Sequence, residues 1–222
     1  MHATPFVLQL LNSLAALLLL LSFAMLAQRR VVTLVNLLAL QGAVLCAATL
    51  LLAWRTGERH LYVSAALTLA LKVVFLPWLL HRLIRRLDVY WDTDTLLNIP
   101  GTMLVGLAIV VFAFGLAQPI SALASTATRS AVGIAVAVIL LAFLTMITRR
   151  KAMSQVVGFL SMENGLFFGA MSATYGMPMI VELGVALDVL VAMLVLGVFF
   201  FQIREQFDSL DLDHLETLKE ER

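Results

Sequence analysis

An all-α integral membrane protein is the fold class that this sequence predicts, and three observations support it. The chain has 222 residues, of which 62% are hydrophobic and only 13% are charged. Apolar stretches of about 18 residues or more, each long enough to cross a bilayer as a helix, follow one another along the chain. Lys and Arg residues gather in alternate connections between these stretches. We therefore predict about seven transmembrane helices, at residues 5–27, 31–54, 61–84, 100–118, 130–148, 153–174 and 178–203.

Residues at the ends of the stretches support these boundaries. Arg29-Arg30 follow the first stretch and nothing basic precedes it, so we interpret it as a membrane helix and not as a signal peptide. Pro100-Gly101 suits a helix N-terminus at the start of the fourth. The sequence Tyr-Gly-Met-Pro at 175–178 predicts a tight turn before the seventh.

The distribution of basic residues predicts how the chain is oriented, because cytoplasmic loops carry an excess of Lys and Arg. With a periplasmic N-terminus, the outer loops hold only Arg55, Arg59 and Arg129. The cytoplasmic segments then hold Arg29, Arg30, Arg82, Arg85, Arg86, Arg149, Arg150, Lys151, Arg204, Lys219 and Arg222. The prediction is a multi-pass protein of the bacterial inner membrane, with a transmembrane domain at 1–203. An acidic cytoplasmic tail at 204–222 follows, which either docks on a soluble partner or hangs free.

Three ionisable residues lie inside apolar stretches, where an ionisable group costs roughly 2.5–3.5 kcal/mol on insertion scales. They are Lys72 in LTLALKVVFLPWLL, Glu163 in VVGFLSMENGLFFGA and Asp188 in LGVALDVLVAMLVLG. Such residues usually face the interior of a helix bundle and are functional. Ion or proton movement is therefore the leading hypothesis, with Lys72, Glu163 and Asp188 as the relay.

Neighbouring residues fit this hypothesis. Asn164 can hydrogen-bond either form of the Glu163 carboxyl group. Pro77 removes a backbone hydrogen bond one turn beyond Lys72, leaves the carbonyl of Val73 without its usual donor, and predicts a kink with a small polar pocket. Glu182 lies nearer the outer surface than Asp188 and is predicted to be interfacial. The alternative for the whole set is structural: buried polar groups that only join helices.

The spacing of Gly165 and Gly169, four residues apart, predicts a close helix–helix approach.

An internal repeat is also predicted, in which the first three stretches correspond to the last three in the same orientation. LLALQGAVL matches FLSMENGLF, which pairs Gln41 with Glu163, and LTLALKVVF matches LGVALDVLV, which pairs Lys72 with Asp188. Parallel repeats of this kind occur in transporters. Chance similarity between Leu- and Ala-rich helices is the alternative, so the polar coincidences carry the argument.

The sequence predicts no metal site and no bound cofactor. Cys46 is the single cysteine, so the chain cannot assemble a cysteine-based Fe–S, zinc or Ni–Fe site by itself. The four histidines, His2, His60, His81 and His214, are scattered over the termini and predicted loops. If the chain serves a redox machine, the electrons pass through another subunit, and no nucleic-acid partner is expected.

These residues carry a resemblance to the hydrogenase-4 component E (HyfE) family over nearly the full length. The shared pattern is an intramembrane Lys followed by a Pro, Met-Glu-Asn-Gly at 162–165, and Val-Glu-x-Gly-x-Ala-x-Asp at 181–188. The Leu-Asp-x-x-x-Leu-x-x-Leu pattern at 210–218 also fits. The second half, 130–203, resembles the NuoK- and MrpC-type small subunits of complex I and of multisubunit cation/proton antiporters. Those subunits commonly have an Asn three residues after the Glu, whereas Asn164 directly follows Glu163 here.

The resemblance implies a non-catalytic subunit in the membrane arm of a group 4 hydrogenase complex, beside antiporter-like subunits and a Ni–Fe hydrogenase or related soluble arm. It implies that Lys72, Glu163 and Asp188 belong to a line of polar residues through which hydrogen evolution is coupled to ion movement. Two other functions stay open: an assembly subunit whose polar residues join helices, and an independent ion transporter.

Overall fold

The computed structural model describes residues 5–87, 90, 98–121, 126–174, 184, 189, 190 and 193. The chain divides into two compact units, Met1–Ala186 and Leu187–Arg222. All of the architecture below belongs to the first unit. The acidic tail at 204–222, and the predicted domain boundary before it, lie outside the described residues.

The described segments are helical throughout the bundle. The helices are α1 (Pro5–Ala27), α2 (Val31–Thr56), α3 (Arg59–Thr68), the π-helix η1 (Leu69–Phe75), α4 (Leu76–Leu87), α5 (Ile99–Ser121), α6 (Thr126–Thr148) and α7 (Ala152–Thr174). The segment α3–η1–α4 is one continuous apolar span, Arg59–Arg86. Six helices in the described residues are therefore long and apolar enough to cross a membrane. The first six predicted spans are confirmed, and the seventh, 178–203, falls almost entirely outside the part of the chain that the structure describes.

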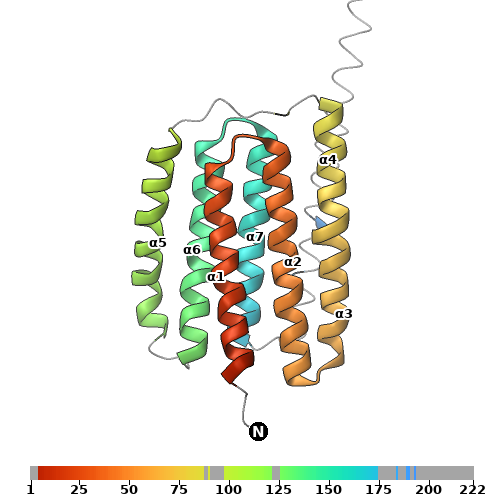
Figure 1. Ribbon diagram of the computed structural model, residues 1–222, viewed down its shortest axis with the longest axis vertical. Helices are drawn as coiled ribbons and strands as arrows, with labels where there is room; N and C mark the ends of the chain where they lie inside the picture. Colours follow the sequence, from red (N-terminus) through yellow and green to blue (C-terminus); the bar gives the residue numbers. More distant parts are fainter. Residues whose placement is uncertain are drawn as a thin grey trace, which may run out of the picture. The chain divides into compact units, whose positions relative to one another are not determined.

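Four helices form the centre of the bundle. α1 packs against α2 and α6, and α7 completes the group by packing against α2 and α6. α5 lies outside against α6, and the α3–η1–α4 segment lies outside against α2 (Figure 1). The main cluster of buried apolar side chains lies between α1, α2, α6 and α7, with Leu18, Leu45, Val138 and Phe167 among its members.

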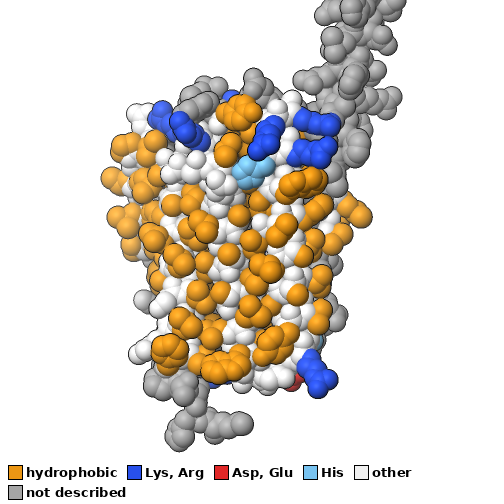
Figure 2. Space-filling model, turned by 45° about the vertical axis from the view of Figure 1, so that its right-hand side comes forward, with side chains coloured by type: hydrophobic (Ala, Val, Ile, Leu, Met, Phe, Trp, Pro, Cys, Tyr) orange, Lys and Arg blue, Asp and Glu red, His pale blue; other side chains and the backbone are white. Residues whose placement is uncertain are grey.

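Exposed side chains follow the pattern expected for a protein in a bilayer. Figure 2 shows hydrophobic side chains over the middle of the visible face, with Lys and Arg at its two ends and mainly at the upper one. Large apolar side chains point outward, among them Leu104, Val111 and Phe112 of α5. An exposed band of apolar side chains of this extent is expected where a bilayer covers the protein surface.

Glycines allow α6 and α7 to approach closely. A Cβ atom on Gly165 would lie 3.0 Å from side-chain atoms of Val138 and Ile139, and one on Gly169 would lie 2.9 Å from Ala135. Both glycines of the predicted motif therefore face α6. Without a strong hydrophobic driving force between helices in lipid, such close van der Waals contact is a main source of helix association.

The side chain of Arg149 joins the two halves of the bundle at its basic end. Its Nη2 atom donates to the carbonyl oxygens of Met25 and Leu26, at 3.4 and 3.1 Å, and to that of Gln28. These carbonyls lie at the C-terminus of α1, where a helix leaves acceptors unsatisfied and where a cation is favourable. Arg149 is buried, so this residue of the predicted basic pair has a structural role.

We expect Arg149→Ala to lower the free energy of unfolding by about 3 kcal/mol, because it removes charge-assisted hydrogen bonds from buried carbonyls. Arg150→Ala is the matched control, since Arg150 is exposed and its removal changes the loop charge equally. Thermal unfolding in detergent measures both. Equal losses in the two variants would contradict the capping role.

Candidate functional site

A buried ion pair lies at the centre of the bundle. Lys72 Nζ lies 3.1 Å from Glu163 Oε1. The side chains are 4% and 2% exposed, and Glu163 is at the midpoint of α7. Both ions are thus far from water, in a bundle whose outer surface is apolar. A buried pair requires additional hydrogen bonds to offset its desolvation.

Asn164 supplies such a hydrogen bond, and further buried polar side chains continue the chain of hydrogen bonds to two other helices. Lys72 Nζ donates to Asn164 Oδ1 at 3.0 Å. Asn164 Nδ2 donates to Gln41 Oε1 at 3.4 Å, and Gln41 Nε2 donates to Ser22 Oγ at 2.9 Å. Ser22 in turn donates to the carbonyl oxygen of Leu18. We call Ser22, Gln41, Lys72, Glu163 and Asn164 the polar network; it links α1, α2, η1 and α7.

The backbone that carries Lys72 is a π-helix. The N–H of Leu76 donates to the carbonyl oxygen of Leu71, five residues back. The next donor in this pattern would be residue 77, but Pro77 has no N–H to offer the carbonyl of Lys72. The sequence predicted that the proline removes the donor to the carbonyl of Val73, as in an α-helix; continued π-helical bonding would place the same effect at the carbonyl of Lys72. π-helical turns inside α-helices are frequent at functional sites.

Gly42 lets α2 approach this turn closely. A Cβ atom at Gly42 would lie 3.0 Å from the Cβ atom of Lys72 and 3.1 Å from its carbonyl oxygen. Only a hydrogen at this position leaves the backbone of Lys72 in place against α2. The glycine therefore helps to set where the lysine side chain begins.

A small cavity adjoins the ion pair. It is lined by Leu38, Lys72, Leu76, Leu160 and Asn164, and gives the centre of a water molecule about 10 Å³ of room. That is close to the minimum for one water. A cavity thus lies where Pro77 predicted a small polar pocket, but three of the five residues that line it are leucines.

The Phe167 ring closes another side of the lysine. Its centroid lies 5.6 Å from Lys72 Nζ, within the range of a cation–π interaction. An aromatic face stabilises a cation without accepting a proton from it, so it helps to hold the charge without competing with the carboxylate.

The structure thus brings together four of the predicted site residues, Gln41, Lys72, Glu163 and Asn164, and places Pro77 one turn away. Asp188 and Glu182 lie outside the described residues, and their part in the site stays a prediction. Sequence reasoning missed Ser22 and Gly42. Ser22 is the one Ser in the second half of the first apolar stretch, which was a signal too weak to single it out.

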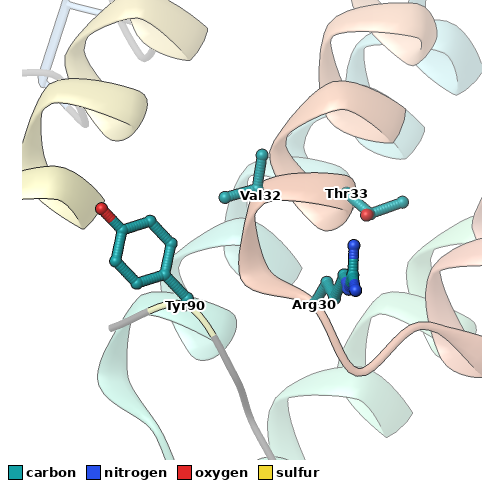
Figure 3. A pocket seen from close by; sticks show the side chains of 4 residues that line it. All are labelled: Arg30, Val32, Thr33 and Tyr90. Carbon is teal, nitrogen blue, oxygen red and sulfur yellow. The ribbon is translucent and has the colours of Figure 1, made fainter. Parts of the chain in front are cut away.

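A second opening lies at the basic end of the bundle and is separate from this site. A cleft of about 360 Å³ is lined by Arg30, Val32, Thr33 and Tyr90. Figure 3 shows Tyr90 on one side of Val32 and the side chains of Arg30 and Thr33 on the other. The cleft lies at the start of α2, about 16 Å along the helix from Gln41. It is too distant to take part in the polar network directly.

The polar network can hold the positive charge of Lys72, and it can respond when the charge of Glu163 changes. Protonation of Glu163 would remove the negative partner of Lys72, while Asn164 would still accept a hydrogen bond from the ammonium group. Among the described residues no group of three or more His, Cys, Asp or Glu side chains gathers as a metal site. The fold and this site define a multi-pass helical membrane protein with a buried, hydrogen-bonded ion pair.

Comparison with known proteins shows the family. The uncharacterized protein Rv0085 of Mycobacterium tuberculosis is 40% identical over 187 residues, which covers 84% of this chain and 85% of that protein. The chain therefore belongs to the same family as Rv0085. Hydrogenase-4 component E of Escherichia coli K12 is 24% identical over 210 residues, covering 95% of this chain and 97% of that protein. The same component of Shigella flexneri matches equally.

The resemblance to hydrogenase-4 component E is confirmed by this full-length homology. No family model matches the chain, and no solved structure matches it. The relation to the NuoK- and MrpC-type subunits and the internal repeat stay predictions.

We expect Gly42→Ala to destabilise the protein by roughly 1–3 kcal/mol, because the new methyl group would overlap the backbone of Lys72. Gly115→Ala on α5 is the control, since nothing lies within 4 Å of a Cβ atom there. Both changes gain the same helix propensity, so thermal unfolding in detergent isolates the steric effect. Equal stability of the two variants would show that α2 can withdraw from η1 at no cost.

We expect Lys72→Met to destabilise the protein by about 3–5 kcal/mol, because it leaves the carboxylate of Glu163 buried without its cation. Adding Glu163→Gln to this variant should restore much of the loss, since no buried charge then remains. Unfolding measurements on both single variants and the double variant form a double-mutant cycle. Strictly additive losses would mean that the two charges do not interact.

Proposed function

We propose that this chain is a non-catalytic membrane subunit of a hydrogenase-4-like complex, in which the polar network takes part in moving protons or other ions. The observation that carries the proposal is the buried Lys72–Glu163 pair, held by side chains of the central helices. Full-length homology to a protein named as a hydrogenase-4 component, together with six apolar helices, supports a membrane subunit of such a complex.

The proposed mechanism is an electrostatic switch. Opposite charges 3.1 Å apart attract each other by about 5 kcal/mol at an effective dielectric constant of about 20. When a proton neutralises Glu163, that attraction is lost and Lys72 can pass a proton on. When the carboxylate is restored, the attraction returns. An interaction of this size is enough to change a two-state equilibrium by several orders of magnitude.

Asp188 and Glu182 complete the proposed set. Asp188 would be the next carboxylate of the relay, and Glu182 would support it nearer the surface. Gln41 and Asn164 would orient the charged groups, and Pro77 would maintain the π-helical turn.

The proposed location is the bacterial inner membrane, with the N-terminus periplasmic and the C-terminus cytoplasmic. The proposal rests on the positive-inside rule: eight of the fifteen Arg and Lys residues lie in the loops after α1 and α6 and in the last two turns of α4. The proposed partners are antiporter-like membrane subunits and a Ni–Fe hydrogenase or related soluble arm. Redox chemistry would take place in those partners.

Two other functions would use the same residues differently. In an assembly subunit, the network would only join helices, and each hydrogen bond would contribute about 0.6–2 kcal/mol. In an independent transporter, the purified chain alone would move ions in liposomes. The internal repeat, if real, favours the transporter.

We expect Glu163→Gln to leave the complex assembled but to uncouple or slow its proton movement, because the amide keeps the shape and loses the charge. The tagged chain is purified from gently solubilised native membranes, its partners are identified by mass spectrometry, and complex yield is read on a native gel. Proton movement is then followed in membrane vesicles. Glu221→Gln, the same chemical change near the chain end, is the control.

Each other outcome selects another function. Normal coupling in the assembled Glu163→Gln complex would overturn the relay. Loss of the complex would favour the assembly subunit. Recovery of the chain without partners, together with transport by the purified chain in liposomes, would favour the independent transporter.

A further inference from the structure

The α3–η1 segment carries a row of polar side chains that leads away from the ion pair. His60, Ser64, Thr68 and Lys72 follow one another at intervals of four residues, a spacing that keeps side chains near one face of a helix. Ser64 and Thr68 are 2% and 1% exposed, and His60 is partly exposed near the start of α3. The row therefore runs from the buried lysine to the turn between α2 and α3.

The hydroxyl group of Ser64 has no hydrogen-bond partner among the residues that the structure describes. Several buried serine and threonine hydroxyls in these helices donate to the carbonyl four residues back, as those of Ser22 and Thr49 do, whereas Ser154 at the basic end has no partner either. A buried hydroxyl that does not bond in this way is costly unless water satisfies it. Ser64 therefore indicates water at this depth of the bundle.

The cavity beside Lys72 has room for about one water next to the lysine, although neither Thr68 nor Ser64 lines it. The π-helical turn adds a second indication, because irregular backbone at membrane depth is tolerated where it lies within protein or lines a water-filled space. α2 covers one side of the row: Cys46 Sγ donates to the carbonyl of Ala65, the residue after Ser64. Consecutive polar positions are about 6 Å apart along the helix axis, a gap that about one or two waters bridge.

We propose that Ser64 and Thr68 line a narrow water path, which connects Lys72 to the solution at the α2–α3 turn and conducts protons. This inference rests on the proposed function and adds the route and the side of the membrane. A proton leaves the Lys72 ammonium group for the nearest water, which leaves a neutral amine. It then passes along the hydrogen-bonded waters beside Thr68 and Ser64 and reaches the solution as hydronium. Movement in the opposite direction restores the ammonium group.

Cysteine accessibility tests the path without knowledge of the electron donor or the partners. Cys46 is the single cysteine, so Cys46→Ser gives a cysteine-free chain that can still donate to the carbonyl of Ala65. Ser64→Cys and Thr68→Cys are then made one at a time. Silver ion, which is small and enters water-filled paths, is added to native membranes. After denaturation, the remaining free thiols are labelled with a fluorescent maleimide.

Neighbouring positions on the outer face of the same helix provide matched controls. Val63 and Leu67 are 61% and 40% exposed to what would be lipid, at nearly the same depths as Ser64 and Thr68. Thr56→Cys, at the exposed end of α2, identifies the side of the membrane on which the turn lies. Membranes of both orientations, right-side-out and inverted, are compared.

The expected result is that silver applied from the side of Thr56 reduces labelling of Ser64→Cys and Thr68→Cys at least tenfold, while labelling of Val63→Cys and Leu67→Cys is unchanged. Full labelling of both inner cysteines would overturn the path, and so would equal protection of all four positions. The proton-movement measurement on Glu163→Gln is independent of this result. Failure of the path and failure of the relay are therefore distinguishable.

Discussion

The buried ion pair between Lys72 and Glu163 is the constraint on which the rest of this structure depends. Each ion alone would cost several kcal/mol at this depth, so each stabilises the other in the bundle. The pair also requires hydrogen bonds beyond its own contact. Asn164 accepts from the lysine, Gln41 accepts from Asn164 and donates to Ser22, and Ser22 donates to the carbonyl of Leu18. The central helices are thereby held in one register.

The backbone adapts to the same pair. Lys72 lies in a π-helical turn, next to a proline that could not serve as a donor, and Gly42 lets α2 contact that turn directly. In a regular α-helix the side chains after Lys72 would face other directions around the helix axis. A larger residue at position 42 would separate α2 from η1. Local irregularity at the centre of a membrane segment is unfavourable in general, and its presence beside buried charges is typical of a functional site.

Packing elsewhere in the bundle keeps this centre in place. Small residues of α7 allow close contact with α6, and Arg149 fixes the loop after α6 to the C-terminus of α1. Gly165 directly follows Asn164, whereas the Arg149 contact lies at the basic end; together they determine the relative positions of α1 and α7, both of which contribute to the polar network. Stability at the basic end and geometry at the centre are therefore linked through rigid helices.

Much of this could be predicted from the sequence, and the reason is physical. A bilayer admits helices of a given length and apolar composition, so six spans and their ends follow from hydropathy alone. The cost of charge in lipid singles out Lys72 and Glu163 in the same way. Asn164 and Pro77 lie close in the chain to Glu163 and Lys72, so the sequence shows these neighbours directly.

Only the tertiary structure decided which of these residues meet. The sequence paired Lys72 with Asp188 across the predicted repeat and left its contact partners open; the fold places it against Glu163 and Asn164. Ser22, Gly42 and the π-helical turn could not be predicted, because a single serine or glycine in an apolar helix has no distinctive pattern. Their importance depends on the rotation and depth of neighbouring helices. Hydropathy determines that a segment spans the membrane, whereas helix packing determines which face it turns inward.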